Sequence, residues 1–244
     1  MHGTSNKLLL VPLLLLLVSR PVSAALPLDT IGDEAMRTAF RQVGLQVMFG
    51  DSLNAMVNAN RLGWEVFNRG KAGKNRELAY SMALQAVAEA ALGMEREALW
   101  HWEAAQLILP ELRGEMMHSY SEIGKVFDST PFRNHQAAVE WLMAEDKLAQ
   151  EGPDTIMPKA IERVSAVAPK RKPSALMGQR IAVTYLVNPE GRPQAPMIAG
   201  SGHSELVMFT VLQALMSWRY EPAQRNGQPA WAMVTTNFSF QKDR

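Results

Sequence analysis

The chain has 244 residues, of which 47% are hydrophobic and 20% charged, a composition typical of globular proteins. Its formal charge of +1 argues against nucleic acid as a partner. The sequence contains no cysteine, which excludes disulfides, thiolate zinc sites, a cysteine nucleophile and lipid attachment at cysteine.

The first 24 residues are typical of an export signal. Lys7 precedes the apolar run Leu8–Val18, and Val22-Ser23-Ala24 offers the small residues that a signal peptidase requires. As a helix this run rises only about 16 Å, roughly half the thickness of a bilayer's hydrocarbon core. We therefore expect residues 1–24 to be a signal peptide cleaved near Ala24, leaving no membrane span in the mature chain. The alternative is a membrane anchor.

Residues 30–150 show helical periodicity throughout. Asp33 and Asp51 can cap helices, and further helices are expected up to residue 150. The pattern predicts six helices in three antiparallel pairs. The first two carry the apolar stripes Met36, Phe40, Val43, Val47 and Leu53, Met56, Asn60, Trp64, Phe67; the others are Asn75–Leu92, Glu95–Leu109, Glu111–Phe127 and Asn134–Gln150.

The third and fourth of these helices resemble one tetratricopeptide repeat (TPR). Small residues, a turn glycine, an aromatic and a terminating proline fall at the motif's positions: Ala86, Gly93, Ala98, Trp102, Ala105 and Pro110. Met82 and Glu89 depart from the motif's large and aromatic residues. The resemblance implies a TPR-like helical domain over 30–150, and generic helical-hairpin packing is the alternative.

Residues 151–173 are expected to be a linker. Four prolines discourage regular structure there, although Pro158–Ala166 is long enough for a short helix.

Residues 174–244 are predicted to form a small α+β domain. Arg180–Val187 is a strand, and Asn188–Arg192 is a turn with Pro and Gly that leads into a second strand, Pro193–Ile198. A helix follows Ser204, and Trp231–Phe240 is a long final strand. The fold expected is a three-stranded antiparallel sheet with one helix, which makes the whole chain an α+β multidomain protein.

This region resembles the C-terminal domain of the TonB family, the energy transducers of Gram-negative bacteria. The resemblance rests on Gly178-Gln179, Asn188–Arg192 (NPEGR), Ala214–Pro222 (ALMSWRYEP), Asn226–Pro229 (NGQP) and Asn237–Phe240 (NFSF). The signature residues, expected to be structural, are Gly191, Trp218, Arg219, Tyr220, Pro222 and Gly227.

The resemblance also implies a partner. In TonB-like domains the last strand receives an extended segment of an outer-membrane transporter. An open strand edge suits such pairing, because unpaired N–H and C=O groups line it. The candidate partner-binding residues are Trp231, Met233, Thr235, Thr236, Asn237 and Ser239. The more apolar alternate set, Ala232, Val234, Thr236 and Phe238, is expected to face the core.

No chemical motif emerges from the sequence. The histidines His101, His118, His135 and His203 lack the spacing of a helical metal site, and His101 and His118 are expected on polar helix faces. Gly200–His203 lacks a nucleophile elbow. We therefore expect no enzymatic activity, no metal and no cofactor.

The function predicted is protein–protein interaction in the periplasm, associated with TonB-dependent outer-membrane transport. A periplasmic TPR scaffold that binds peptides or envelope components is the alternative, with Trp64, Trp100 and Trp102 near its helical groove. A glycan-binding accessory is a third hypothesis. Two copies pairing through the C-terminal sheet are also possible.

Overall fold

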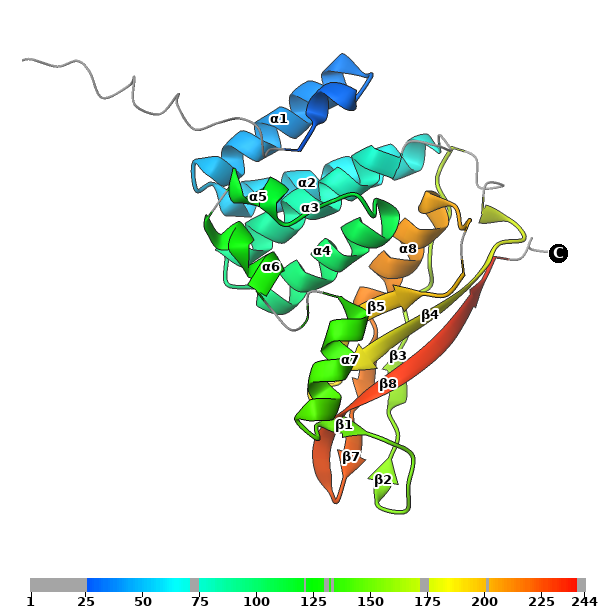
Figure 1. Cartoon of the computed structure of the whole chain (residues 1–244). Helices are drawn as coiled ribbons and strands as arrows, with labels where there is room; N and C mark the ends of the chain where they lie inside the picture. Colours follow the sequence, from blue (N-terminus) through cyan, green and yellow to red (C-terminus); the bar gives the residue numbers. More distant parts are fainter. Residues whose placement is uncertain are drawn as a thin grey trace, which may run out of the picture.

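A computed structural model describes residues 26–70, 75–120, 122–129, 132, 134–171, 176–200 and 202–240, and the predicted signal peptide lies outside these ranges. A stack of helices sits on one end of an antiparallel sheet (Figure 1). None of the described helices is both long and apolar enough to cross a membrane. The coarse prediction of an α+β chain, with helices first and sheet last, is confirmed.

The first four predicted helices are present. Asp33 caps the first by accepting a hydrogen bond from the Met36 N–H (3.1 Å), and Gly70 ends the second in the left-handed conformation (φ 60°). A short 3₁₀ turn, η2 (Leu28–Thr30), precedes them. The helices are α1 (Glu34–Met48), α2 (Ser52–Arg69), α3 (Asn75–Ala91) and α4 (Glu95–Ile108).

Helix α2 turns a different face to the core from the one its strongest stripe indicates. The buried hydrophobic residues are Ala55, Ala59, Leu62, Val66 and Phe67, and of the predicted stripe only Phe67 is among them. Leu53 is 60% exposed. Small alanines occupy these positions because they let α2 approach α3 closely.

The extents predicted for the helices Glu111–Phe127 and Asn134–Gln150 are wrong. The first is broken into short turns, where a β-carbon on Gly124 would overlap the Met117 carbonyl. The second ends early, at Ala144, and Asp146 just after it adopts a positive φ of 51°. The observed elements are α5 (Glu115–His118), η3 (Glu122–Lys125), α6 (Val126–Ser129), α7 (His135–Ala144) and the strand β1 (Leu148–Ala149).

The predicted strands and helix of the C-terminal part are present, but the sheet has further strands. Its strands lie in the order β2 (Thr155–Ile156), β7 (Ala223–Arg225), β8 (Gln228–Ser239), β4 (Arg180–Val187) and β5 (Pro193–Ile198), with β1 joining β8 in parallel. The additions come from short segments that the sequence pattern does not distinguish from turns. The elements are β4 (Arg180–Val187), β5 (Pro193–Ile198), α8 (Glu205–Met216), β6 (Arg219–Glu221), β7 (Ala223–Arg225) and β8 (Gln228–Ser239).

The expected linker contains regular structure. It forms β2 (Thr155–Ile156), which pairs with β7, and β3 (Lys159–Glu162), which pairs with β6. Residues 158–166 therefore do not form the short helix for which the segment is long enough. Further on, the Val167 N–H donates to the Thr210 hydroxyl of α8 (2.8 Å), and that hydroxyl donates back to the Val167 carbonyl (2.7 Å). These bonds hold the segment against the sheet and α8.

One hydrophobic core spans the helices and the sheet. Phe209 of α8 lies between the two parts, with its ring centroid 5.2 Å from Trp64 and 5.3 Å from Phe67 of α2. The described helical and sheet parts are thus packed directly on each other. The assignment of α3 and α4 to a tetratricopeptide repeat stays a prediction.

Trp102 gives a test of the helical core. Its side chain is 1% exposed and stacks on Phe127, with ring centroids 5.0 Å apart. We predict that Trp102→Ala lowers the free energy of unfolding by about 3–5 kcal/mol, because it leaves a large cavity. Leu53→Ala on the exposed face of α2 is the control and should change it by less than about 1 kcal/mol. Chemical denaturation measures both, and equal effects would contradict this packing.

Candidate functional site: the open edge of the last strand

The longest strand, β8, is paired on only one edge along its second half. Strand β4 pairs with it from Ala232 to Ser239, while β7 and β1 reach only as far as Ala232 from the other end. In the described part of the chain, no second strand pairs with Met233–Ser239. Figure 1 shows β8 in red with β4 along one side. This half of β8 therefore keeps an edge of unpaired backbone groups.

The hydrogen bonds determine which backbone groups point outward. The Phe240 N–H donates to the Gln179 carbonyl just beyond β4 (3.1 Å), so it points to the β4 side. Successive N–H groups alternate between the two edges of a strand. The N–H groups of Thr236 and Phe238 therefore face β4, while those of Thr235 and Asn237 face the open edge.

A second bond agrees with this assignment. The Ala199 N–H donates to the Ala182 carbonyl (3.0 Å), which directs the backbone of Ala182 toward β5. Ala182 lies opposite Asn237 in the register. Because the backbone of Ala182 is directed toward β5, Ala182 and Asn237 are not a hydrogen-bonded pair. The Asn237 N–H is consequently left for the open edge.

The side chains of β8 alternate as the sequence indicates. Ala232 is fully buried, and Val234 and Phe238 pack against the core. The opposite row, Met233, Thr235, Asn237 and Ser239, is exposed and carries no charge. Thr235 also bonds across to Thr184, with the two hydroxyl oxygens 2.9 Å apart. An incoming strand would meet an uncharged surface beside the open edge.

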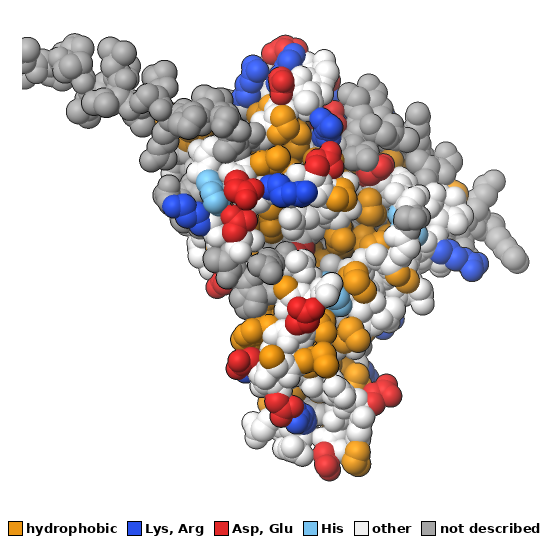
Figure 2. Space-filling view, viewed as in Figure 1, with side chains coloured by type: hydrophobic (Ala, Val, Ile, Leu, Met, Phe, Trp, Pro, Cys, Tyr) orange, Lys and Arg blue, Asp and Glu red, His pale blue; other side chains and the backbone are white. Residues whose placement is uncertain are grey.

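Trp231 occupies a different place from the other predicted partner-binding residues. Its backbone is already paired with Leu148 of β1, and its ring packs on Phe132, with centroids 5.0 Å apart. It lines a hollow of about 520 Å³ together with Trp141, Arg225 and other residues. Figure 2 shows hydrophobic side chains gathered on the lower part of the molecule, where Figure 1 draws α7. The structure thus separates Trp231 from the open edge.

Two signature residues lock the turn between β4 and β5. Gly191 has a φ of 74°, and a β-carbon there would overlap the Tyr220 carbonyl. The Tyr220 N–H donates to the Gly191 carbonyl (2.9 Å), and the Tyr220 hydroxyl bonds to the Tyr185 hydroxyl. Only glycine fits this close approach.

The remaining signature residues also make structural contacts. The Trp218 indole N–H donates to the Val164 carbonyl (2.8 Å), and its ring lies 5.3 Å from Phe238, below β8. Arg219 donates to the carbonyls at the end of α8, Pro222 separates β6 from β7, and Gly227 (φ 74°) turns the β7–β8 hairpin. These contacts shape the sheet whose edge is open.

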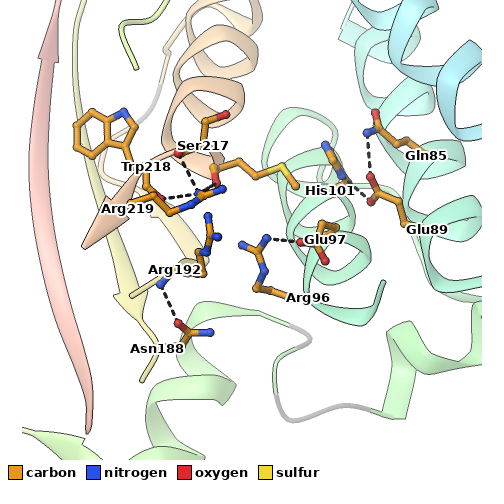
Figure 3. A network of polar contacts seen from close by, with 11 residues as sticks. Gln85, Glu89, Arg96, Glu97, His101, Asn188, Arg192, Ser217, Trp218 and Arg219 are labelled. Atoms are coloured by element: carbon orange, nitrogen blue, oxygen red, sulfur yellow. Dashed lines mark hydrogen bonds and ion pairs between the residues drawn. The ribbon is translucent and has the colours of Figure 1, made fainter. Parts of the chain in front are cut away.

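A buried polar network was not anticipated from the sequence. His101 was expected on a polar face, but it is buried, with its Nδ1 2.7 Å from a carboxylate oxygen of Glu89. The Gln85 amide donates to the other oxygen (2.9 Å), as Figure 3 shows. The signal in the sequence was an acidic residue, Glu89, and a histidine, His101, twelve positions apart on either side of the Gly93 turn. Among the described residues no group of His, Asp and Glu is arranged to hold a metal ion.

Comparisons with known proteins include a partial likeness to a solved structure. No protein-family model matches the chain, and no curated protein matches it. It is similar to a solved structure described as the solution NMR structure of Pseudomonas aeruginosa TonB CTD, at 23% identity. That likeness covers 38% of this chain and 94% of the other, with a TM-score of 0.28. It is too low to support an argument about function.

Glu103 gives a pH test of the interior. It is buried in α4, one carboxylate oxygen has no hydrogen-bond partner, and burial raises its pKa well above the ordinary 4.5. The folded chain therefore binds this proton more tightly than the unfolded chain does. The stability that Glu103 contributes is complete below its unfolded pKa and is lost as pH rises through the folded pKa.

We predict that Glu103→Gln loses less stability than the native chain as the pH rises above about 5, because the amide stays neutral. Melting temperatures across this range measure the difference. Glu115→Gln, at an exposed position of α5, is the control and should follow the native curve. Identical pH dependence in native protein and Glu103→Gln would contradict the assignment of a protonated buried Glu103.

Proposed function

We propose that this protein binds other proteins in the Gram-negative cell envelope by taking an extended segment onto the open edge of β8. The observation that carries the proposal is the unpaired edge over Met233–Ser239. Strand addition satisfies backbone groups on both chains and needs few specific side chains. The edge can accommodate about seven residues of a partner.

The sequence resemblance to the TonB family supports the identity of the partner. It points to the periplasmic end of an outer-membrane transporter, and the predicted signal peptide supports a periplasmic location for the mature protein. Its signature residues Gly191, Trp218 and Tyr220 make contacts that shape the sheet carrying this edge. The proposed role is binding without catalysis. A second copy of β8 is the competing occupant of the edge.

The second candidate function, a peptide-binding scaffold, is favoured by a groove on α2. Met56, Val57, Arg61 and Trp64 line a hollow of about 410 Å³ there, with Gln85 of α3 at its side. Of the three tryptophans considered from the sequence, Trp100 and Trp102 are fully buried, so only Trp64 lies at this groove. Apolar side chains at this spacing on one helix suit an amphipathic helical ligand.

Two neighbouring proline substitutions test strand addition. Thr235→Pro removes an outward N–H, so we expect a folded protein with at least tenfold weaker binding of transporter-derived segments. Thr236→Pro removes an N–H directed at β4, so it should lower the free energy of unfolding by about 1–3 kcal/mol or more. Calorimetric titration of a panel of such segments, together with thermal melts, measures both effects.

Thr235→Val is the matched control for this pair. It removes the hydroxyl contact to Thr184 but keeps the backbone donor, so it should bind as the native chain does. Native-like affinity in Thr235→Pro would show that this edge is not the binding site. If instead a segment binds and substitution of Val57 or Trp64 abolishes that binding, the scaffold function is favoured. Loss of a dimer in Thr235→Pro would identify a second copy as the occupant.

The proposed localisation has a separate test. We expect the mature protein to begin at or near Ala25 and to be released from cells by osmotic shock, because a short apolar run is followed by small residues. N-terminal sequencing of the released protein checks this. Recovery only with membranes, with Lys7 retained, would instead indicate an anchored protein.

A further inference from the structure

Three arginines from distant parts of the sequence gather between α4 and the sheet. Arg96 lies in the first turn of α4, Arg192 follows the β4–β5 turn, and Arg219 follows α8. The bond between the Tyr220 N–H and the Gly191 carbonyl holds the backbones beside Arg192 and Arg219 together. Figure 3 shows the three guanidinium groups pointing into the same space.

Their interactions leave positive charge uncompensated. Arg96 is paired with Glu97 through one nitrogen, while its Nη1 is buried and has no hydrogen-bond partner. Arg192 Nη1 is likewise buried and unpartnered. Arg219 donates to the carbonyls of Ser217 (2.9 Å) and Trp218 (2.8 Å), which are uncharged. Three guanidinium groups thus share one carboxylate, and within the described chain no other acid forms an ion pair with them.

The turn that carries Arg192 is fixed in this position. The side-chain oxygen of Asn188 accepts hydrogen bonds from the N–H groups of Glu190 (3.1 Å) and Arg192 (2.8 Å). Gly191 is held against Tyr220 at a positive φ. The guanidinium of Arg192 is therefore held in the cluster by a rigid turn, although its Nη1 has no hydrogen-bond partner among the described residues.

A partly buried guanidinium cannot lose its proton, so it requires an acceptor or a counter-charge. We propose that Arg96 and Arg192, with Arg219 beside them, bind a phosphate-type oxyanion. The two excess positive charges match a phosphate, which carries about −1.5 to −2 at neutral pH. A single carboxylate would be satisfied by one guanidinium fork, whereas donors arriving from separate elements suit a tetrahedral group. This site is independent of the β8 edge.

Thermal melting of the purified full chain tests the site. Sodium phosphate should raise the melting temperature above that in sodium chloride at equal ionic strength, because a ligand of the folded state stabilises it. Arg192→Gln should abolish this gain, and without phosphate it should melt at or above the native temperature because an unpaired charge is removed. Arg225→Gln, at an arginine already paired with Asp146, should keep the phosphate gain.

Two further variants sharpen the test. Arg96→Gln should also abolish the gain, and it serves if Arg192→Gln fails to fold. Glu97→Gln should bind phosphate at least threefold more tightly, because it removes the competing carboxylate. Equal melting in phosphate and chloride would overturn the proposal, as would a gain that persists in both arginine variants.

The same variants identify the source of the phosphate group. Glycerol phosphate, a soluble monoester, should reproduce the gain if the natural ligand is a free small molecule. Sedimentation with phosphatidylglycerol vesicles, abolished by Arg192→Gln, would identify a lipid headgroup. Sedimentation that is unchanged in Arg192→Gln would count against this cluster as the lipid site.

Discussion

The antiparallel pairing of β4 with β8 is the constraint on which the rest of the structure depends. Its register directs Ala232, Val234 and Phe238 toward the core and the uncharged row that includes Met233 and Thr235 toward solvent. The same register determines which backbone groups of β8 bond to β4 and which remain unpaired. A shift by one residue would bury the polar row and reverse the two edges. The open edge is therefore a consequence of how the core is packed.

The surrounding elements hold this sheet and leave its edge free. Trp218 supports Phe238 from below, and its indole is bonded to Val164 of the preceding segment. Phe209 joins the sheet's helix to α2, so the helices and the sheet share one core. Strand β1 meets β8 only at Trp231 and Ala232. Partner binding at the edge would thus occur on a scaffold that is already rigid.

Sequence patterns predicted the long elements because local signals there agree with tertiary packing. The β-branched strand β4, the two-residue alternation in β8, the glycine turn at Gly191 and the Asp33 cap all appear as expected. The short strands could not be foreseen, since β1, β2 and β3 acquire their conformation from partners far along the chain. The buried face of α2 was missed because alanines carry a weaker pattern than larger residues such as Leu53, which is exposed. The arginine cluster could not be predicted from the sequence because its members meet only through tertiary contacts.

Hydrogen exchange along β8 tests the central claim most directly, because it reads each backbone donor without requiring a ligand. NMR-resolved exchange in the unliganded protein should show Thr236 and Phe238 strongly protected, since their N–H groups bond to β4. Thr235 and Asn237, between and beside them, should exchange much faster because their donors face the open edge. Uniform protection of all four amides would show that another segment already covers this edge, and would contradict the account.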